Sequence, residues 1–227
     1  MVWLNANLGY VLDLAGYHLL QAVVPLVLSV LIAIPLAQLA RLNKTAGGVL
    51  LTAGSVLYTV PSLALFVILP SILGTRILDL ANIIVALTIY AVALLVRSTV
   101  DALNSVDDGI RQAAVAMGFK PLQRFLSVDL PLSVPVLFAG LRVISVSNVS
   151  LVTVGALLGI PSLGFLFTDG LRRDFMTEIV VGIAGTLLLA LVLDAILVLL
   201  QRLLTPWLRS PRAAAAATGT AAAGGAA

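Results

Sequence analysis

Long apolar runs separated by short polar connections dominate the sequence. An α-helix needs roughly 20 apolar residues to cross about 30 Å of hydrocarbon. Runs of this length or more cover residues of about 18–40, 49–73, 80–103, 134–158 and 178–204. The pattern predicts an all-α fold, a polytopic membrane helical bundle of about five transmembrane helices. Residues 18–205 form one membrane domain, which residues 1–17 precede and residues 206–227 follow.

Prolines lie inside the first two runs, at Pro25, Pro35, Pro61 and Pro70. Neighbouring helices or water can satisfy the carbonyls that a proline leaves free in a membrane helix. We therefore predict each run as one span, in which the prolines mark places where the helix can bend.

The composition supports a membrane protein and excludes several kinds of chemistry. Hydrophobic residues make up 61% of the chain and charged residues 10%, whereas a soluble domain carries roughly 25% charge. The chain has no cysteine, one histidine (His18) and no Gly-rich phosphate loop. We expect no catalytic residue, no metal and no cofactor on this chain. The scattered arginines set membrane topology rather than bind nucleic acid.

Lysines and arginines near the span ends are distributed unequally between the two sides. Eight lie on one side, within 41–44, 111–124 and 202–212, and three lie on the other, at positions 76, 172 and 173. The positive-inside rule puts the richer side in the cytoplasm. Segment 1–17 is then external, loop 104–133 is cytoplasmic, and the Ala- and Gly-rich tail 206–227 is a disordered cytoplasmic segment.

The cytoplasmic loop has the pattern of two short helices. Asp107 or Asp108 can cap the first helix, and Gly118 stands where a left-handed residue would end it. Pro121 suits the start of the second helix, which Leu130–Pro131 would close. Small alanines beside bulky Met117 and Phe119 favour a docking peg for a partner protein. The alternative is an amphipathic connector lying on the lipid surface.

The spacing within this loop resembles the signature of permease subunits of binding-protein-dependent ABC importers. That signature reads Glu-Ala-Ala, three residues, Gly, nine residues, then Ile-x-Leu-Pro. The chain has Gln112-Ala113-Ala114, Gly118 and Val128-Asp129-Leu130-Pro131 at this spacing, with Gln replacing Glu and Val replacing Ile. The resemblance implies a type I (MetI-like) importer permease fold in which the loop seats on an ATPase. The implied ATPase-coupling residues are Gln112, Ala113, Ala114, Met117, Gly118, Phe119, Lys120 and Pro131.

The same resemblance implies the partners and the location. The partners are ATP-binding cassette ATPase subunits carrying ATP and Mg, a second permease chain and an extracytoplasmic solute-binding protein. The location is the bacterial cytoplasmic (inner) membrane. An ion-gradient-driven carrier and a membrane enzyme remain as alternatives; the first would favour an inverted repeat and paired intramembrane carboxylates.

Shorter matches resemble the osmoprotectant branch of this family, which handles glycine betaine, choline, carnitine or proline. They are Thr59–Ala64, Ile89–Ala91 with Val96–Thr99, and Gly159–Gly164. Aromatic faces recognise quaternary ammonium groups. The expected substrate path comprises Tyr58, Pro61, Ser62, Phe66 and Tyr90. Another small solute, such as an amino acid, is the alternative.

Isolated polar residues in the spans are expected to be structural. Arg97 can pair with Asp101 one turn later, and Arg142 can contact the loop or a neighbouring helix. Asp194 is expected to pair with an arginine. His18 is interpreted as a wet residue at the outer interface. The external stretch 159–177, too short to span, is expected to be re-entrant or surface-lying, with its charged residues solvated.

Overall fold

The computed structural model describes residues 2–209 and contains no strand among them. The all-α prediction is confirmed. The helices are α1 (Val2–Ala6), α2 (Leu8–Leu42), α3 (Lys44–Thr59), α4 (Ser62–Leu73), α5 (Leu80–Asn104), α6 (Asp108–Ala116), α7 (Pro121–Arg124), α8 (Leu130–Gly155), α9 (Phe165–Arg172) and α10 (Met176–Leu204). A π turn (Phe125–Asp129) and two 3-10 turns (Ala156–Leu158 and Pro206–Arg209) complete the order.

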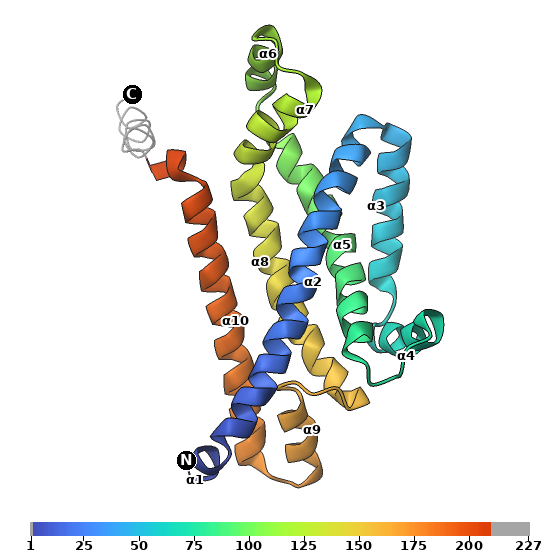
Figure 1. The fold of residues 1–227 in the computed structure, drawn as a ribbon, viewed down its shortest axis with the longest axis vertical. Helices are drawn as coiled ribbons and strands as arrows, with labels where there is room; N and C mark the ends of the chain where they lie inside the picture. Colours follow the sequence, from blue (N-terminus) through green and yellow to red (C-terminus); the bar gives the residue numbers. More distant parts are fainter. Residues whose placement is uncertain (1, 210–227) are drawn as a thin grey trace, which may run out of the picture.

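Four long, apolar helices stand roughly upright and can cross a membrane (Figure 1). They are α2, α5, the continuous helix Pro121–Leu158, and α10; the bent pair α3–α4 makes a fifth span if counted as one. Helix α2 begins at Leu8, so most of the predicted external segment 1–17 is helical. The start of the predicted tail forms a 3-10 turn at Pro206–Arg209, and the rest of that prediction lies outside the described residues.

The second predicted span, 49–73, is divided into two helices at Pro61, one of the positions where a proline was predicted to allow a bend. Helices α3 and α4 meet at a bend of 105°. Val60 and Pro61 are both extended there, with ψ of 129° and 131°. The residue before a proline avoids the helical region, and the bend exposes the Val60 carbonyl. The Tyr90 hydroxyl of α5 donates to that carbonyl at 2.6 Å, which replaces the lost helical bond.

Helix α5 lies at the centre of the bundle and packs against α2, α3 and α8. Its fully buried Leu95 belongs to one core cluster with Leu141 of α8, and its Leu87 belongs to a second cluster with Phe66 of α4. Small residues allow close contact: a Cβ at Gly54 would lie 3.0 Å from the Ala93 carbonyl oxygen. Such contacts are typical of membrane helices, which pack through small residues.

Two buried polar side chains of α2 tie it to the end of the bundle that bears α9. His18 Nε2 donates to the Val149 carbonyl at 3.1 Å, and Gln21 Nε2 donates to the Pro161 carbonyl at 2.7 Å. Both side chains are fully buried. The interpretation of His18 as a wet interfacial residue is therefore wrong. The His18 side chain instead joins α2 to α8 by a hydrogen bond, because a membrane bundle satisfies its polar groups internally.

The stretch 159–177, predicted to be re-entrant or surface-lying, contains the short helix α9 at Phe165–Arg172. Gly159 has φ +86°, and the chain turns back to form α9, whose Leu166 is fully buried. Helix α9 packs against α10 at the end of the bundle opposite α6 (Figure 1). Arg173 pairs with Asp169 at 2.9 Å. The Asp169 carboxylate thereby raises the pKa of Arg173 above its usual value.

Helix α10 has little packing apart from α8 and α9, and it leans away from the bundle toward its C-terminal end (Figure 1). A bidentate ion pair crosses from α8: Arg142 Nε and Nη2 donate to the two oxygens of Asp194 at 2.6 and 2.8 Å. The prediction that Asp194 pairs with an arginine is confirmed. Arg97 and Asp101 are both exposed and form no ion pair within residues 2–209, so that predicted pair is absent.

We expect Arg142→Leu to lower the melting temperature of the detergent-purified chain by roughly 5 °C, because an unpaired carboxylate within a span is costly. The double variant Arg142→Leu/Asp194→Leu removes both charges and should melt close to the unmodified chain. Val143→Leu, at the neighbouring exposed position, is the control. A double variant that melts as low as the single variant would contradict a role for the ion pair.

Candidate functional site

The projecting helix α6 has both of its ends fixed by local hydrogen bonds. At its start, the Asp107 carboxylate accepts from the backbone N–H of Gly109 at 2.8 Å and of Ile110 at 3.2 Å. At its end, Gly118 has φ +83°. Gly118 N–H donates to Val115 O, and the next residue, Phe119, donates to Ala114 O. This is the Schellman motif, in which glycine avoids Cβ strain. Both predicted ends are confirmed.

The second helix of the loop starts as predicted but does not end as predicted. Pro121 is the first residue of α7. Leu130–Pro131 does not close the helix, because α7, a π turn and α8 run on as one 38-residue helix, Pro121–Leu158. Pro131 has no N–H, and its ring clashes with the carbonyl four residues earlier. The preceding turn widens instead: Leu130 N–H donates to Phe125 O, five residues back.

The predicted coupling residues do not all lie on one surface. Ala114 is 2% exposed and is the buried residue of α6, whereas Met117 at its end is 70% exposed. The others divide between the exposed Gln112, Ala113, Gly118 and Lys120 and the half-buried Phe119 and Pro131. The helix therefore packs inward through Ala114, and Met117 with its exposed neighbours faces outward. A partner can reach Met117 but not Ala114.

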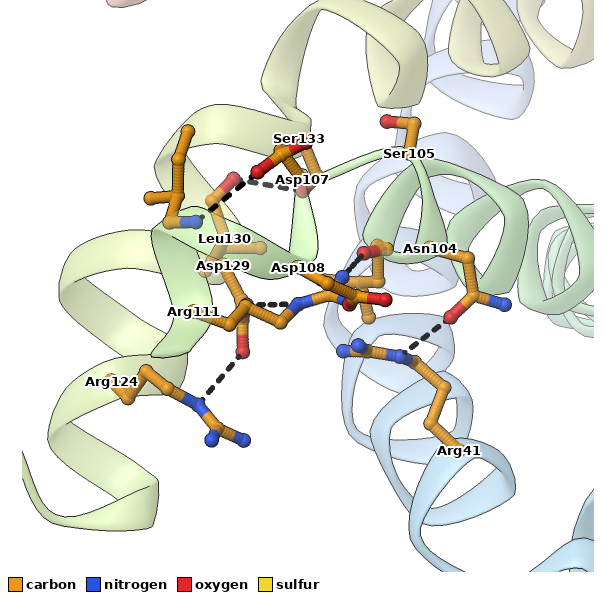
Figure 2. A network of polar contacts seen from close by, with 12 residues as sticks. Arg41, Asn104, Ser105, Asp107, Asp108, Arg111, Arg124, Asp129, Leu130 and Ser133 are labelled. Atoms are coloured by element: carbon orange, nitrogen blue, oxygen red, sulfur yellow. Dashed lines mark hydrogen bonds and ion pairs between the residues drawn. The ribbon is translucent and has the colours of Figure 1, made fainter. Parts of the chain in front are cut away.

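A buried carboxylate at the base of the loop is the feature that the sequence prediction missed (Figure 2). Asp129 is fully buried at the end of the π turn. Its Oδ1 accepts from Arg111 Nε of α6 at 3.0 Å, and its Oδ2 lies 3.6 Å from Arg124 Nε. Arg111 also donates to the exposed Asp108 carboxylate at 2.6 Å. The sequence offered two signals for this pair: Arg111 directly precedes Gln112, and Asp129 directly precedes Leu130-Pro131.

Further bonds link this base to the ends of α2 and α5. Arg111 donates a third hydrogen bond, to the Leu103 carbonyl of α5. Arg41 of α2 donates to the Asn104 side chain at 2.9 Å (Figure 2). Among residues 2–209, no group of three or more His, Cys, Asp or Glu side chains could hold a metal ion. The site is a junction of α2, α5, α6 and α8 that is held by ion pairs and hydrogen bonds.

A cavity of about 430 Å³ lies beside the α3–α4 bend. Tyr58, Ser62 and Tyr90 line it together with residues of α8. The two tyrosine rings meet edge to face, with centroids 6.1 Å apart and an interplanar angle of 87°. The structure thus brings together three of the five predicted path residues. Phe66 is buried in the core instead, and Pro61 forms the bend without lining this cavity.

A membrane bundle with a projecting helical hairpin at one end belongs to the class of transport permeases. The model for the family described as binding-protein-dependent transport system inner membrane components matches residues 26–210. The chain belongs to this family. It is therefore a multi-pass inner-membrane permease subunit of an ATP-driven importer, and ATP hydrolysis resides on a separate chain.

Individual relatives cover nearly the whole chain. The osmoprotectant import permease protein OsmW of Salmonella typhimurium is 33% identical, over 88% of this chain and 94% of its own length. The glycine betaine/carnitine/choline permease protein OpuCD of Bacillus subtilis is 28% identical, over 89% of this chain and 87% of its own. The inward-facing methionine transporter MetNI contains a chain of the same fold, with a TM-score of 0.72, 21% identity, and coverage of 86% of this chain and 97% of that one.

We expect Met117→Ala to weaken association with the partner ATPase about tenfold or more, because an exposed bulky side chain at the end of α6 can fill a partner pocket. Co-elution of the purified chains, titrated over concentration, measures this. Leu171→Ala is the matched control: Leu171 is 76% exposed but lies on α9, at the opposite end of the bundle. Equal losses for the two variants would contradict docking through α6.

Proposed function

We propose that this permease carries a small osmoprotectant with a quaternary ammonium group, such as glycine betaine, choline or carnitine. It works with a second permease chain, with ATP-binding cassette ATPases that carry ATP and Mg, and with an extracytoplasmic solute-binding protein. The names of the relatives in Salmonella typhimurium and Bacillus subtilis support this substrate class. The observation that carries the proposal is the tyrosine-lined cavity beside the α3–α4 bend.

The chemistry of that cavity suits a trimethylammonium group. Such a cation has no hydrogen to donate, and aromatic faces attract it through their quadrupoles. Tyr58 and Tyr90 present edge-to-face rings rather than a closed stack, and Ser62 adds a polar group for the other end of the solute. A broken helix beside a cavity is also where transporters commonly place substrate sites.

The loop end of the bundle is the proposed cytoplasmic end. Basic residues of the α2–α3 connection and of the loop gather there, near the C-terminal end of α10 (Figure 1). The positive-inside rule favours this orientation, with the N-terminus outside and the C-terminus inside. The exposed residues of α6 and its C-terminal turn then seat on the ATPase, and the α9 end receives the solute-binding protein.

Transport is proposed to proceed by alternating access. One five-span chain encloses little, so two permease chains are proposed to face each other across a central path. Helix α10 leaves most of its apolar surface uncovered within residues 2–209, which suits contact with lipid and with a second permease. ATP binding on the partner ATPases biases the pair between outward- and inward-open states.

We expect Tyr58→Ala to reduce glycine betaine uptake about tenfold, and Tyr58→Phe to retain most of it, because phenylalanine keeps the aromatic face. The assay measures uptake of labelled solute by a bacterial strain that lacks its own osmoprotectant importers and produces this chain with its ATPase and binding protein. Tyr17→Ala is the control, since Tyr17 is an exposed tyrosine of α2 outside the cavity.

Three outcomes would overturn parts of the proposal. Uptake of an amino acid in preference to trimethylammonium solutes would reject the substrate class. Uptake that persists without the ATPase and collapses with the ion gradient would indicate a carrier. Equal loss in Tyr58→Ala and Tyr17→Ala would remove the cavity from the solute path.

A further inference from the structure

Helix α6 has a sparse attachment to the rest of the chain. Its packing is against α7 and the π turn, and Ala114 is its buried side chain. One small apolar residue gives little packing energy compared with a full helix face. What fixes α6 relative to α8 must therefore be largely polar, and the polar contacts converge on Arg111.

Two carboxylates hold Arg111, and they differ greatly in environment. Asp108 is on α6 itself, three residues earlier, and its side chain is 82% exposed. A pair of this kind is screened by water and contributes little. Asp129 is the last residue of the π turn that leads into α8, and its side chain is fully buried. Only the second pair joins two separate elements, and in a buried site its charges interact much more strongly.

Burial also makes this contact all-or-none. A buried carboxylate that loses its arginine keeps the desolvation penalty and gains nothing in exchange. Arg124 is only a weak substitute for Arg111 as the partner of Asp129. Its Nε lies 3.6 Å from Asp129 Oδ2, and that oxygen has no hydrogen bond within the described residues. Sliding α6 along α8 would therefore break the bond to Arg111 without an equivalent replacement.

The backbone aims the carboxylate at α6. Asp129 ends the π turn, a feature that frequently marks functional positions in helices. In Figure 2 the side chains of Asp129 and Arg111 point toward one another across the gap between α8 and α6. Arg111 reaches on to the Leu103 carbonyl at the end of α5. One guanidinium thus connects the docking helix to two central helices of the bundle.

We propose that Asp129, through Arg111, is the positioning residue that makes α6 and the start of α8 move as one body. A displacement of α6 by the ATPase then reaches the membrane helices instead of being absorbed in the loop. This inference rests on the proposed docking of α6 on the ATPase. It assigns no catalytic role to Asp129, which contacts no solute or nucleotide in this scheme.

The test uses the complete complex, reconstituted in proteoliposomes with its ATPase and binding protein. Solute uptake and ATP hydrolysis are measured together, and their ratio is the readout. We expect Asp129→Asn to lower this ratio on the order of tenfold, while co-elution with the ATPase stays within about twofold, because the exposed residues of α6 are unchanged. Arg124→Gln should have a smaller effect than Arg111→Gln, since Arg124 is farther from the carboxylate.

Two further variants separate positioning from stability. Asp108→Asn removes the exposed partner of the same arginine and should leave the ratio within about twofold. Asp129→Asn/Arg111→Gln removes both charges of the pair, so the chain should regain any yield and melting temperature lost in Asp129→Asn. The ion pair between Asp129 and Arg111 is still absent in this double variant, so its solute uptake per ATP hydrolysed should stay low. A double variant that regains the normal ratio would overturn the proposal.

A second readout needs no solute. The chain has no cysteine, so spin labels can be placed at Ile110 of α6 and Val143 of α8, both exposed. We expect a narrow distance distribution in the unmodified chain, with and without ATP, and a broad one in Asp129→Asn. A narrow distribution in Asp129→Asn rejects the inference. Absence of glycine betaine uptake by the unmodified complex rejects the substrate class instead, and leaves the distance result intact.

Discussion

Helices in a bilayer gain little hydrophobic driving force by packing against one another, because lipid tails are as apolar as leucine. This bundle therefore depends on close backbone approach and on a few polar bonds between helices. A Cβ at Gly140 of α8 would collide with the Ser98 side chain of α5, and one at Gly164 would lie 2.5 Å from the Thr153 carbonyl oxygen. Where such contacts are dense, around α5, the bundle is compact. Helix α10 packs mainly against α8 and α9, and a bidentate ion pair adds a polar connection to α8.

The same constraint explains the two places where the chain departs from straight helices. At the α3–α4 bend, the carbonyl of Val60 is free to accept the hydroxyl of Tyr90, so a break in the backbone is satisfied from a neighbouring helix. At the start of α8, the π turn accommodates Pro131 by moving one hydrogen bond back by a residue. Each departure places side chains that the regular helix would direct elsewhere: the tyrosines at the cavity, and Asp129 beneath α6.

Local signals in the sequence predicted local structure well, and failed where a distant partner decides. Gly118 could be placed because a left-handed helix end is a property of a few neighbouring residues. The sequence marked Pro61 as one place where a helix can bend, but it could not show that the helix breaks there. Other prolines stay inside their helices, and only the tertiary partner of the freed carbonyl distinguishes this one. His18 was given the wrong surroundings for the same reason: its burial depends on Val149 of α8, far along the chain. Asp129 occupies the variable position of the signature, so the pattern gave it no weight.

The π turn gives the spacing of the signature a geometric meaning. A regular α-helix turns by about 100° per residue, so one residue more or fewer between Gly118 and Pro131 would swing α6 around the axis of α8 by more than a quarter of a circle. The number of residues between Gly118 and Pro131 therefore fixes the direction in which α6 faces. Substitutions at the exposed positions of this stretch alter surface chemistry, but a single insertion or deletion would turn the docking helix away from its partner.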